Sequence, residues 1–170
     1  VRMKHDLPVR WIETGVRDEF RGEARKGEYY AFQVAVFAAR HSLDELKIEW
    51  GDFRITGSNQ NIPASRVTCF NARGVDWRGE VFTKKISVSK GDVQALWFGV
   101  DVPRDVIPGV YEGTVSIMPD GGETRMVRII LSVGGESVAD AGDADPRLYS
   151  RLRWLDSRIA LDDRVTEPFV

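Results

Sequence analysis

Cysteine and histidine are scarce in this chain, and they are the usual protein ligands of a structural zinc ion. There is one cysteine, Cys69, and the two histidines, His5 and His41, lie far apart in the sequence. A lone cysteine excludes an internal disulfide, and no metal-ligand spacing is present. We therefore predict no metal site. Cys69 has apolar neighbours and no basic residue beside it, so we expect a buried, unreactive thiol.

An excess of one charge and a long hydrophobic run are also missing. Lys and Arg together number 24 and Asp and Glu 26, which gives a formal net charge of -2 at pH 7. Such a charge is too weak to attract nucleic acid. The longest apolar stretch, around residues 31–39, contains Gln33 and is shorter than the roughly 20 residues that span a bilayer. We therefore expect neither nucleic acid nor a membrane as a partner.

Motifs of nucleotide binding and nucleophilic catalysis are absent as well. The sequence has no P-loop, no glycine-rich dinucleotide fingerprint and no recognisable Ser, His and acid trio. The pair of glycines at 121 and 122 is accounted for by a hairpin turn. The sequence thus predicts no cofactor.

Short alternating stretches separated by turn residues dominate what is present. The chain has 170 residues, 42% hydrophobic and 29% charged, which suits one ordinary globular core. No stretch of a dozen residues has a helical apolar stripe. The pattern predicts an all-β protein with a two-sheet antiparallel β-sandwich, Ig-like or jelly-roll-like.

The domain organisation follows from composition. Residues 1–136 are predicted to form the sandwich, and residues 137–147, rich in Ala, Asp and Gly, a linker. Residues 148–170 are then the start of a following β segment or domain, or strands that return to the sandwich. Because the chain opens on Val1 with no signal-like segment and stops after an extended-looking stretch, we expect it to be a fragment of a longer protein.

Several strands can be placed from the sequence. Residues 29–37 and 93–102 have apolar positions on both faces, which predicts two central strands. Residues 110–133 predict a hairpin with its turn at 120–123. Pro108 and Gly109 before it suit a type II turn, because proline presets φ and glycine tolerates a positive φ.

A polar segment at residues 71–80 is the strongest candidate for a binding loop. Trp77 offers a flat ring that can stack on the apolar face of a pyranose, and polar neighbours can hydrogen-bond its hydroxyl groups. These candidate carbohydrate-binding neighbours are Asn71, Arg73, Asp76 and Arg78. Two other interpretations stay open: Trp77 folds back to plug one end of the sandwich, or the loop packs against another domain.

Catalytic carboxylates are harder to find. A glycosidase needs two of them, roughly 5 to 10 Å apart, facing one sugar. Asp162 and Asp163 are adjacent and would point to opposite faces of a strand. Asp76 and Glu80 flank Trp77, where they suit holding a sugar better than cleaving it. We therefore assign no catalytic residue to this chain.

Four stretches together resemble a known family. Residues 102–115 contain VP followed by GVYEGTV, which looks like the V-P-x-x-x-x-x-G-x-Y-x-G-x-V signature of Ig-like modules in bacterial polysaccharide-degrading enzymes. The others are GEYYAFQ at 27–33, TCFN with GVDW within 68–77, and SRLRWLDS at 150–157. Together they resemble the N-terminal β-sandwich domain of bacterial glycoside-hydrolase-like proteins related to glycoside hydrolase family 123.

The resemblance extends from Trp11 to Asp163 and implies a β-sandwich in front of a larger catalytic domain, commonly a TIM-like barrel with an acidic pair. A barrel needs roughly 250 residues, so the catalytic groups would lie outside this chain. The implied function is a noncatalytic module that packs on, or helps to shape, a carbohydrate active site in a secreted, periplasmic or cell-surface protein. The alternatives are a carbohydrate-binding module, with a poly- or oligosaccharide as partner, and a purely structural or protein-interaction Ig-like domain. Interface packing explains Trp154 as well as ligand binding does.

Overall fold

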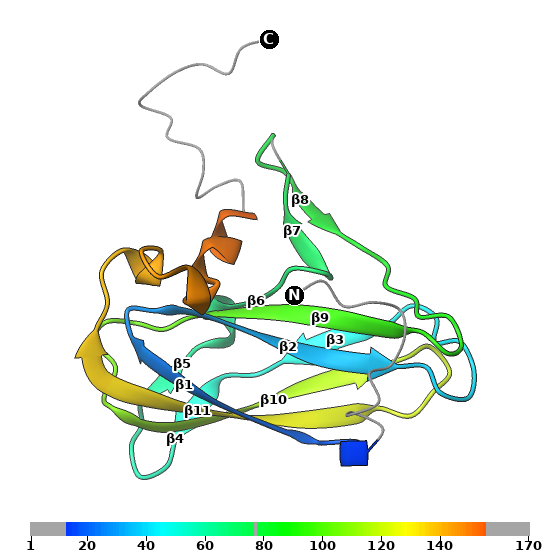
Figure 1. The fold of residues 1–170 in the computed structure, drawn as a ribbon, viewed down its shortest axis with the longest axis horizontal. Helices are drawn as coiled ribbons and strands as arrows, with labels where there is room; N and C mark the ends of the chain where they lie inside the picture. Colours follow the sequence, from blue (N-terminus) through cyan, green and yellow to red (C-terminus); the bar gives the residue numbers. More distant parts are fainter. Residues whose placement is uncertain (1–12, 77, 156–170) are drawn as a thin grey trace.

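The computed structural model describes residues 13–76 and 78–155, and it confirms the predicted all-β sandwich (Figure 1). The larger sheet has the strand order β1-β11-β10-β4-β5, with β3 also paired to β10. Its strands are β1 (Glu19–Lys26), β3 (Lys47–Trp50), β4 (Phe53–Ile55), β5 (Asn61–Ile62), β10 (Gly109–Met118) and β11 (Arg125–Ser137). The smaller sheet has the order β2-β9-β6, formed by β2 (Tyr29–Phe37), β6 (Val67–Cys69) and β9 (Val93–Asp101).

Strand pairing within both sheets is antiparallel, with one exception. β1 runs parallel to β11, from Glu19 opposite Arg128 onward. The predicted hairpin over residues 110–133 is confirmed as β10 and β11, which pair from Gly109 with Val133 to Ile117 with Arg125. Side chains along β10 alternate between buried and partly exposed, as the period of a strand with one face on the core requires.

The turn predicted at Pro108 and Gly109 is wrong in type. Gly109 has a nearly extended φ of 157° and already pairs with Val133 in the sheet, so it opens β10 instead of occupying the second position of a type II turn. The hydroxyl of the fully buried Tyr111 donates a hydrogen bond of 2.8 Å to the carbonyl of Ile107, four residues earlier. This arrangement is the tyrosine corner found in Ig-like sandwiches, and it explains why the motif places a tyrosine there.

The two predicted central strands differ in outcome. β9 lies between β2 and β6 and is buried along most of its length, as predicted. Among the described residues, β2 pairs with β9 alone and lies at the edge of the sheet. The prediction that residues 29–37 form a central strand is therefore wrong. Its two-sided apolar pattern has another cause: Tyr29 lies across Gly99 of β9, where a Cβ would collide with the tyrosine ring. Ala35 and Phe37, at the far end of β2, are exposed.

The core lies between the sheets and is rich in aromatic contacts. Phe98 of β9 is fully buried, stacks on Phe32 at 5.3 Å between ring centroids and meets Trp50 edge to face at 5.9 Å. Phe20 of β1 also stacks on Phe32, with ring centroids 4.8 Å apart. Because Trp50 and Phe20 belong to the larger sheet and Phe32 and Phe98 to the smaller, these rings join the two layers.

A run of short 3-10 helices follows the sandwich: η2 (Asp140–Gly142), η3 (Pro146–Leu148) and η4 (Ser150–Leu155). The run lies against the smaller sheet, because η4 contacts β2 and β9, and Tyr149 packs on Trp97 of β9 with centroids 6.0 Å apart. The division into a sandwich at 1–136, a linker at 137–147 and a following segment stays a prediction. Within the described ranges, no helix has the length and apolarity to cross a membrane.

Candidate functional site

The candidate binding loop at residues 71–80 is largely a β-hairpin. β7 (Arg73–Val75) pairs with β8 (Val81–Thr83), and the hairpin projects away from the sandwich (Figure 1). Asp76 closes its turn: one carboxylate oxygen accepts hydrogen bonds from the backbone amides of Arg78 (2.9 Å) and Glu80 (3.0 Å). Aspartate commonly stabilises turns in this way, so the role found for this oxygen of Asp76 is structural.

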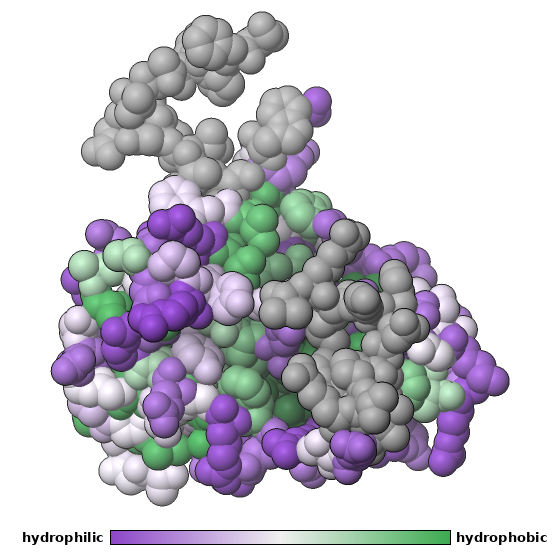
Figure 2. Space-filling model, viewed as in Figure 1, coloured by the Kyte–Doolittle hydropathy of each residue, from purple (hydrophilic) through white to green (hydrophobic). Residues whose placement is uncertain are grey.

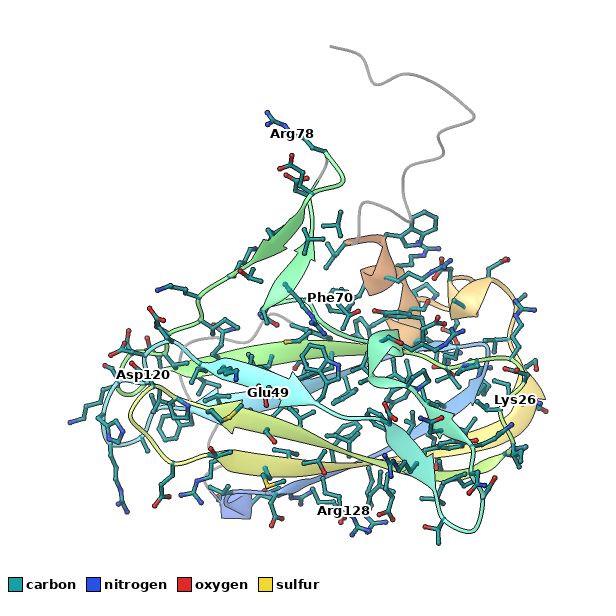
Figure 3. The ribbon with its side chains drawn as sticks, turned by 180° about the vertical axis from the view of Figure 1, so that it is seen from behind. Lys26, Glu49, Phe70, Arg78, Asp120 and Arg128 are labelled. Atoms are coloured by element: carbon teal, nitrogen blue, oxygen red, sulfur yellow. The ribbon has the colours of Figure 1, made fainter. Side chains whose placement is uncertain are left out.

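The structure separates the predicted carbohydrate-binding residues into two groups. Asn71 and Arg73 lie at the base of the hairpin, while Asp76 and Arg78 lie at its tip (Figure 3). The guanidinium of Arg73 sits over the ring of Trp50, 4.3 Å from its centroid. Trp77 lies outside the described residues, as do Asp162 and Asp163 of the weighed carboxylate pair. A common sugar site on these side chains therefore stays a prediction.

Asn71 extends the strand ladder beyond β6. Its side-chain oxygen accepts a 2.7 Å hydrogen bond from the backbone amide of Trp97, while the amide of Phe70 donates to the carbonyl of Trp97 at 2.9 Å. The asparagine oxygen thus takes the place of a backbone carbonyl at the point where β6 ends.

Replacing Asn71 with alanine should leave the Trp97 amide without its partner. We expect the free energy of unfolding to fall by about 1–3 kcal/mol, measured by urea denaturation of the 170-residue chain. Asn71→Asp keeps an acceptor oxygen and should lose less. Equal losses for the two variants would contradict the assigned role.

Asp143 is the centre of a polar cluster that the sequence did not reveal. Its carboxylate accepts hydrogen bonds of 2.8 Å each from Ser150 Oγ, Arg153 Nη2 and Trp154 Nε1. Its backbone carbonyl accepts another from Arg151 Nε at 3.1 Å. We call these five residues the Asp143 cluster. It joins η4 to the segment that precedes it.

Burial alone would raise the pKa of Asp143, but its hydrogen bonds from Arg153, Trp154 and Ser150 favour the charged form. They lower the pKa from 3.8 to about 2. At neutral pH the carboxylate is therefore fully ionised and acts as a fixed acceptor. It is engaged by three donors and does not resemble a general acid held ready for proton transfer.

Exposed apolar side chains flank this cluster. Trp154 is 47% exposed although its indole N–H is bound by Asp143 and its ring lies 5.0 Å from the guanidinium carbon of Arg153. Tyr149 and Leu155 on the same segment and Val81 on β8 are also exposed. We call the three exposed apolar residues of the last described segment, Tyr149, Trp154 and Leu155, the apolar end face. Hydrophobic surface is visible in this region, where η4 and the β7–β8 hairpin rise from the smaller sheet (Figure 2).

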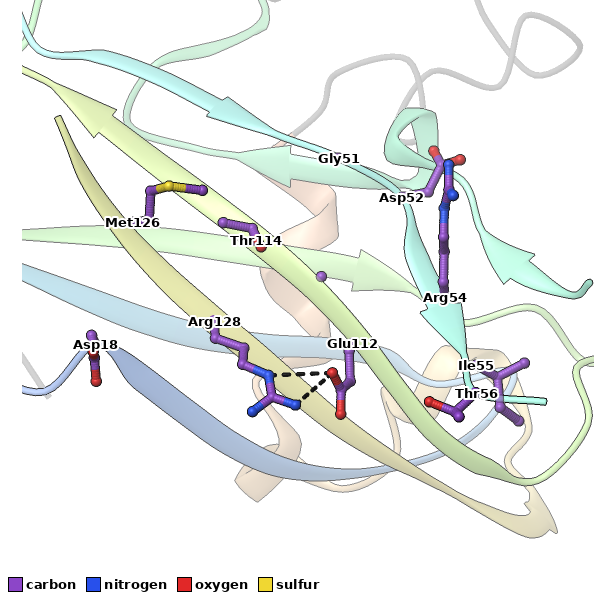
Figure 4. A pocket seen from close by; sticks show the side chains of 11 residues that line it. Asp18, Gly51, Asp52, Arg54, Ile55, Thr56, Glu112, Thr114, Met126 and Arg128 are labelled. Atoms are coloured by element: carbon purple, nitrogen blue, oxygen red, sulfur yellow. Dashed lines mark hydrogen bonds and ion pairs between the residues drawn. The ribbon is translucent and has the colours of Figure 1, made fainter. Parts of the chain in front are cut away.

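A shallow groove of about 780 Å³ on the outer side of the larger sheet has a different character (Figure 4). Arg128 in it pairs with Glu112 at 2.6 Å, and the Asp52 carboxylate accepts hydrogen bonds from Ala64 N (2.9 Å) and Asn61 Nδ2 (2.8 Å). None of the described residues that line it is aromatic. Three of its charged side chains, Asp52, Glu112 and Arg128, are thus engaged within the protein.

Metal ligands do not gather in the described ranges: no group of three or more His, Cys, Asp or Glu side chains could hold an ion there. Cys69 is buried, and this burial raises the pKa of its thiol, as expected for an unreactive cysteine.

Taken together, the two packed sheets and the tyrosine corner define an Ig-like β-sandwich. No protein-family model matches the chain, and no curated protein matches its sequence.

Among solved structures, the fold is similar to part of a family 123 glycoside hydrolase from Clostridium perfringens. That match has a TM-score of 0.60 and 11% sequence identity, and covers 74% of this chain but 24% of the hydrolase. The TM-score is lower, 0.37, for a PapD-like domain of human CEP192, which is 14% identical over 72% of this chain and 84% of that one. The periplasmic chaperone SfaE is at a similar level (TM-score 0.39, 12% identity, 76% and 60%). At these identities the likeness is one of fold.

Proposed function

We propose that this chain is a noncatalytic β-sandwich module of a larger glycoside hydrolase, and that it packs against the catalytic domain that follows it. The observation that carries the proposal is the apolar end face, which lies on the last described segment of the chain and is too exposed to serve the sandwich core. The overlap with about a quarter of a family 123 glycoside hydrolase supports it, as do the stretches that resemble that family.

The engagement of three acidic side chains, those of Asp76, Glu112 and Asp143, supports a noncatalytic role. A retaining or inverting glycosidase needs one carboxylate free to give up a proton and a second to attack or to activate water. Glu112 pairs with Arg128, and Asp143 is held by three donors. One oxygen of Asp76 binds two backbone amides. In this proposal the chemistry takes place in the following domain, and the whole protein is secreted, periplasmic or on the cell surface.

The test has two parts. The complete open reading frame should encode a barrel domain with an acidic pair after this chain. The 170-residue chain should release no aryl alcohol from a panel of aryl glycosides, while the full-length protein hydrolyses at least one of them. Hydrolysis by the chain alone would overturn the noncatalytic assignment, and a reading frame without a hydrolase domain would overturn the modular one.

Carbohydrate binding at the hairpin tip is the second candidate function. It is favoured by the position of Arg78, which is exposed at the end of a projecting hairpin (Figure 3). Binding at this tip would make the tryptophan fluorescence of the chain respond to added oligosaccharides, and Trp77→Ala would abolish the response. The module proposed above requires no such response.

A further inference from the structure

We propose that residues 1–11, which precede the described ranges, bind along the free edge of β2 as a fourth strand of the smaller sheet. The free edge is the side of β2 that does not face β9. This inference does not depend on the proposed function. It assigns an interaction surface on the sandwich and the segment of the same chain that occupies it.

The free edge of β2 is long and unprotected. β2 has nine residues, none of them charged and none of them proline, and among the described residues it pairs with β9 alone. In an antiparallel pair, the backbone N–H and C=O groups of alternate residues point away from the partner strand. A long edge of this kind is a template for pairing with another strand, and native proteins usually cover it or blunt it with charges.

The other edge strands of the two sheets are protected in the usual ways. β1, at the edge of the larger sheet, carries five charged residues among its eight. β3, β5 and β6 are short, with four, two and three residues. Among the described strands of the two sheets, β2 is thus the one whose edge requires a cover.

Apolar side chains beside this edge are only partly buried. β1 and β2 diverge from their connection toward the end of β2 (Figure 1). Near the connection, the hydroxyl of Tyr30 reaches β1 at Gly22, where a Cβ would collide with it. Farther along, Phe20 and Val36 pack on the core yet stay partly exposed, and Phe37 is 40% exposed. A strand with one apolar face, placed along the edge, would cover Phe20 and Val36.

Residues 1–11 have the sequence pattern of such a strand. The odd positions are apolar except for His5, and the even positions are charged or proline: Val1, Met3, Leu7, Val9 and Trp11 against Arg2, Lys4, Asp6, Pro8 and Arg10. Successive side chains of a strand point to opposite faces, so this segment has one apolar and one polar face. Charged residues and proline are typical of edge strands, which places the segment at the outside of the sheet.

Chain connectivity brings the segment to the open end of β2. β1 and β2 are joined by a tight connection, in which the amide of Glu28 donates to the carbonyl of Arg25 at 3.1 Å. Glu19, at the start of β1, therefore lies at the same end of the sandwich as Phe37, at the end of β2. A segment that precedes β1 and pairs with β2 then runs parallel to it.

Length and tethering favour this segment over a second copy of the chain. Eleven extended residues reach roughly 36 Å at about 3.3 Å each, which is enough for the roughly 30 Å of a nine-residue strand. The residues between the segment and β1 provide the turn. A tethered segment has an effective concentration on the order of millimolar, which a free second copy would have to match.

The first experiment measures hydrogen exchange of backbone amides in the 170-residue chain. Val9→Asp places a charge on the apolar face of the segment and should accelerate exchange of the free-edge amides of β2 at least tenfold. Arg10→Asp introduces the same residue one position later, on the polar face, and should change them less than twofold. Unchanged exchange in β9 and β10 shows that the sandwich stays folded in both variants.

Three results of this experiment would overturn the inference. They are equal effects of the two variants, free-edge amides that already exchange in the wild type as fast as those of an open strand, and protection that appears only at high protein concentration. The last result would assign the edge to a second copy.

The second experiment locates the segment directly. A nitroxide is attached to the Arg10→Cys variant, in which the native Cys69 is buried and stays unlabelled. The label should broaden the NMR signals of β2 amides and leave those of β5 and β6 sharp, because these two strands lie at the opposite edges of the two sheets. Broadening of β5 and β6, or of no strand, would contradict binding at the free edge of β2.

Discussion

Replacing Phe98 with alanine is expected to lower the free energy of unfolding by about 3–5 kcal/mol. Phe98 is fully buried at the centre of β9, where it stacks on Phe32 and meets Trp50 edge to face. Its removal leaves a cavity between the two sheets, and neighbours held in a ladder on both sides of β9 cannot collapse into it. The whole stability of a domain is commonly 5–15 kcal/mol, so this variant should be close to unfolding.

Urea denaturation followed by tryptophan fluorescence measures this loss, and Phe37→Ala provides the matched control. Phe37 is the same residue type in the adjacent strand, but it is 40% exposed at the end of β2. We expect it to lose less than about 1 kcal/mol. Similar losses for the two variants would contradict the description of Phe98 as the residue that joins the two layers.

Strand periodicity was a sound guide where one face of a strand meets the core. β10 alternates in sequence and in burial, and its hairpin with β11 was predicted from the turn at residues 120–123. Periodicity failed for β2, because burial on its outer side does not come from a second neighbouring strand. It comes at one end from Tyr29, which folds across Gly99, and from η4, which contacts the strand. Contacts between residues far apart in the sequence leave no pattern in the sequence of the strand itself.

For the candidate site, too, local sequence predicted one part and missed what depends on contacts made only in the folded chain. Polar composition drew attention to residues 71–80, but it could not tell a sugar-binding side chain from one that holds the backbone. The side-chain oxygen of Asn71 accepts a hydrogen bond from the backbone amide of Trp97, and one oxygen of Asp76 accepts hydrogen bonds from two backbone amides of the turn. The sequence predicts that Asp143 belongs to a linker, because Asp, Ala and Gly surround it. Its donors come from residues 150–154, and only the folded segment brings them to one carboxylate.

Asp143→Asn is expected to release the segment that carries Trp154. The amide keeps one acceptor oxygen, but its NH₂ group faces donors, and the charge that pairs with Arg153 at 2.8 Å is lost. We expect a cost of about 2–3 kcal/mol, which is a roughly 30- to 150-fold larger opening constant. The substitution should favour local opening of residues 140–155 and leave the rest of the sandwich unchanged. Hydrogen exchange of the backbone amides of residues 140–155 should therefore accelerate, while that of β9 and β10 should not.

Asp140→Asn makes the same chemical change three residues away and is the control. Asp140 is exposed, and asparagine tolerates its φ of 47°. We expect exchange of residues 140–155 to change by less than threefold in this variant. Equal acceleration in both variants would show that removing a negative charge from the segment, and not the hydrogen bonds of Asp143, controls its opening.

The lowered pKa of Asp143 adds a pH dependence with a definite sign. Because the folded form holds the carboxylate ionised, with a pKa of about 2 against 3.8, its contribution is complete above about pH 4 and is lost as the pH falls toward 2. Opening of residues 149–155 should therefore increase over that window in the wild type.

Asp145, whose pKa Arg147 also lowers to about 2, titrates in the same window, so the informative quantity is the difference between the wild type and Asp143→Asn. That difference should be largest above pH 4 and vanish toward pH 2. A constant difference would mean that Asp143 acts by packing alone, and the anchoring of Trp154 would then depend on shape and not on the ionised carboxylate.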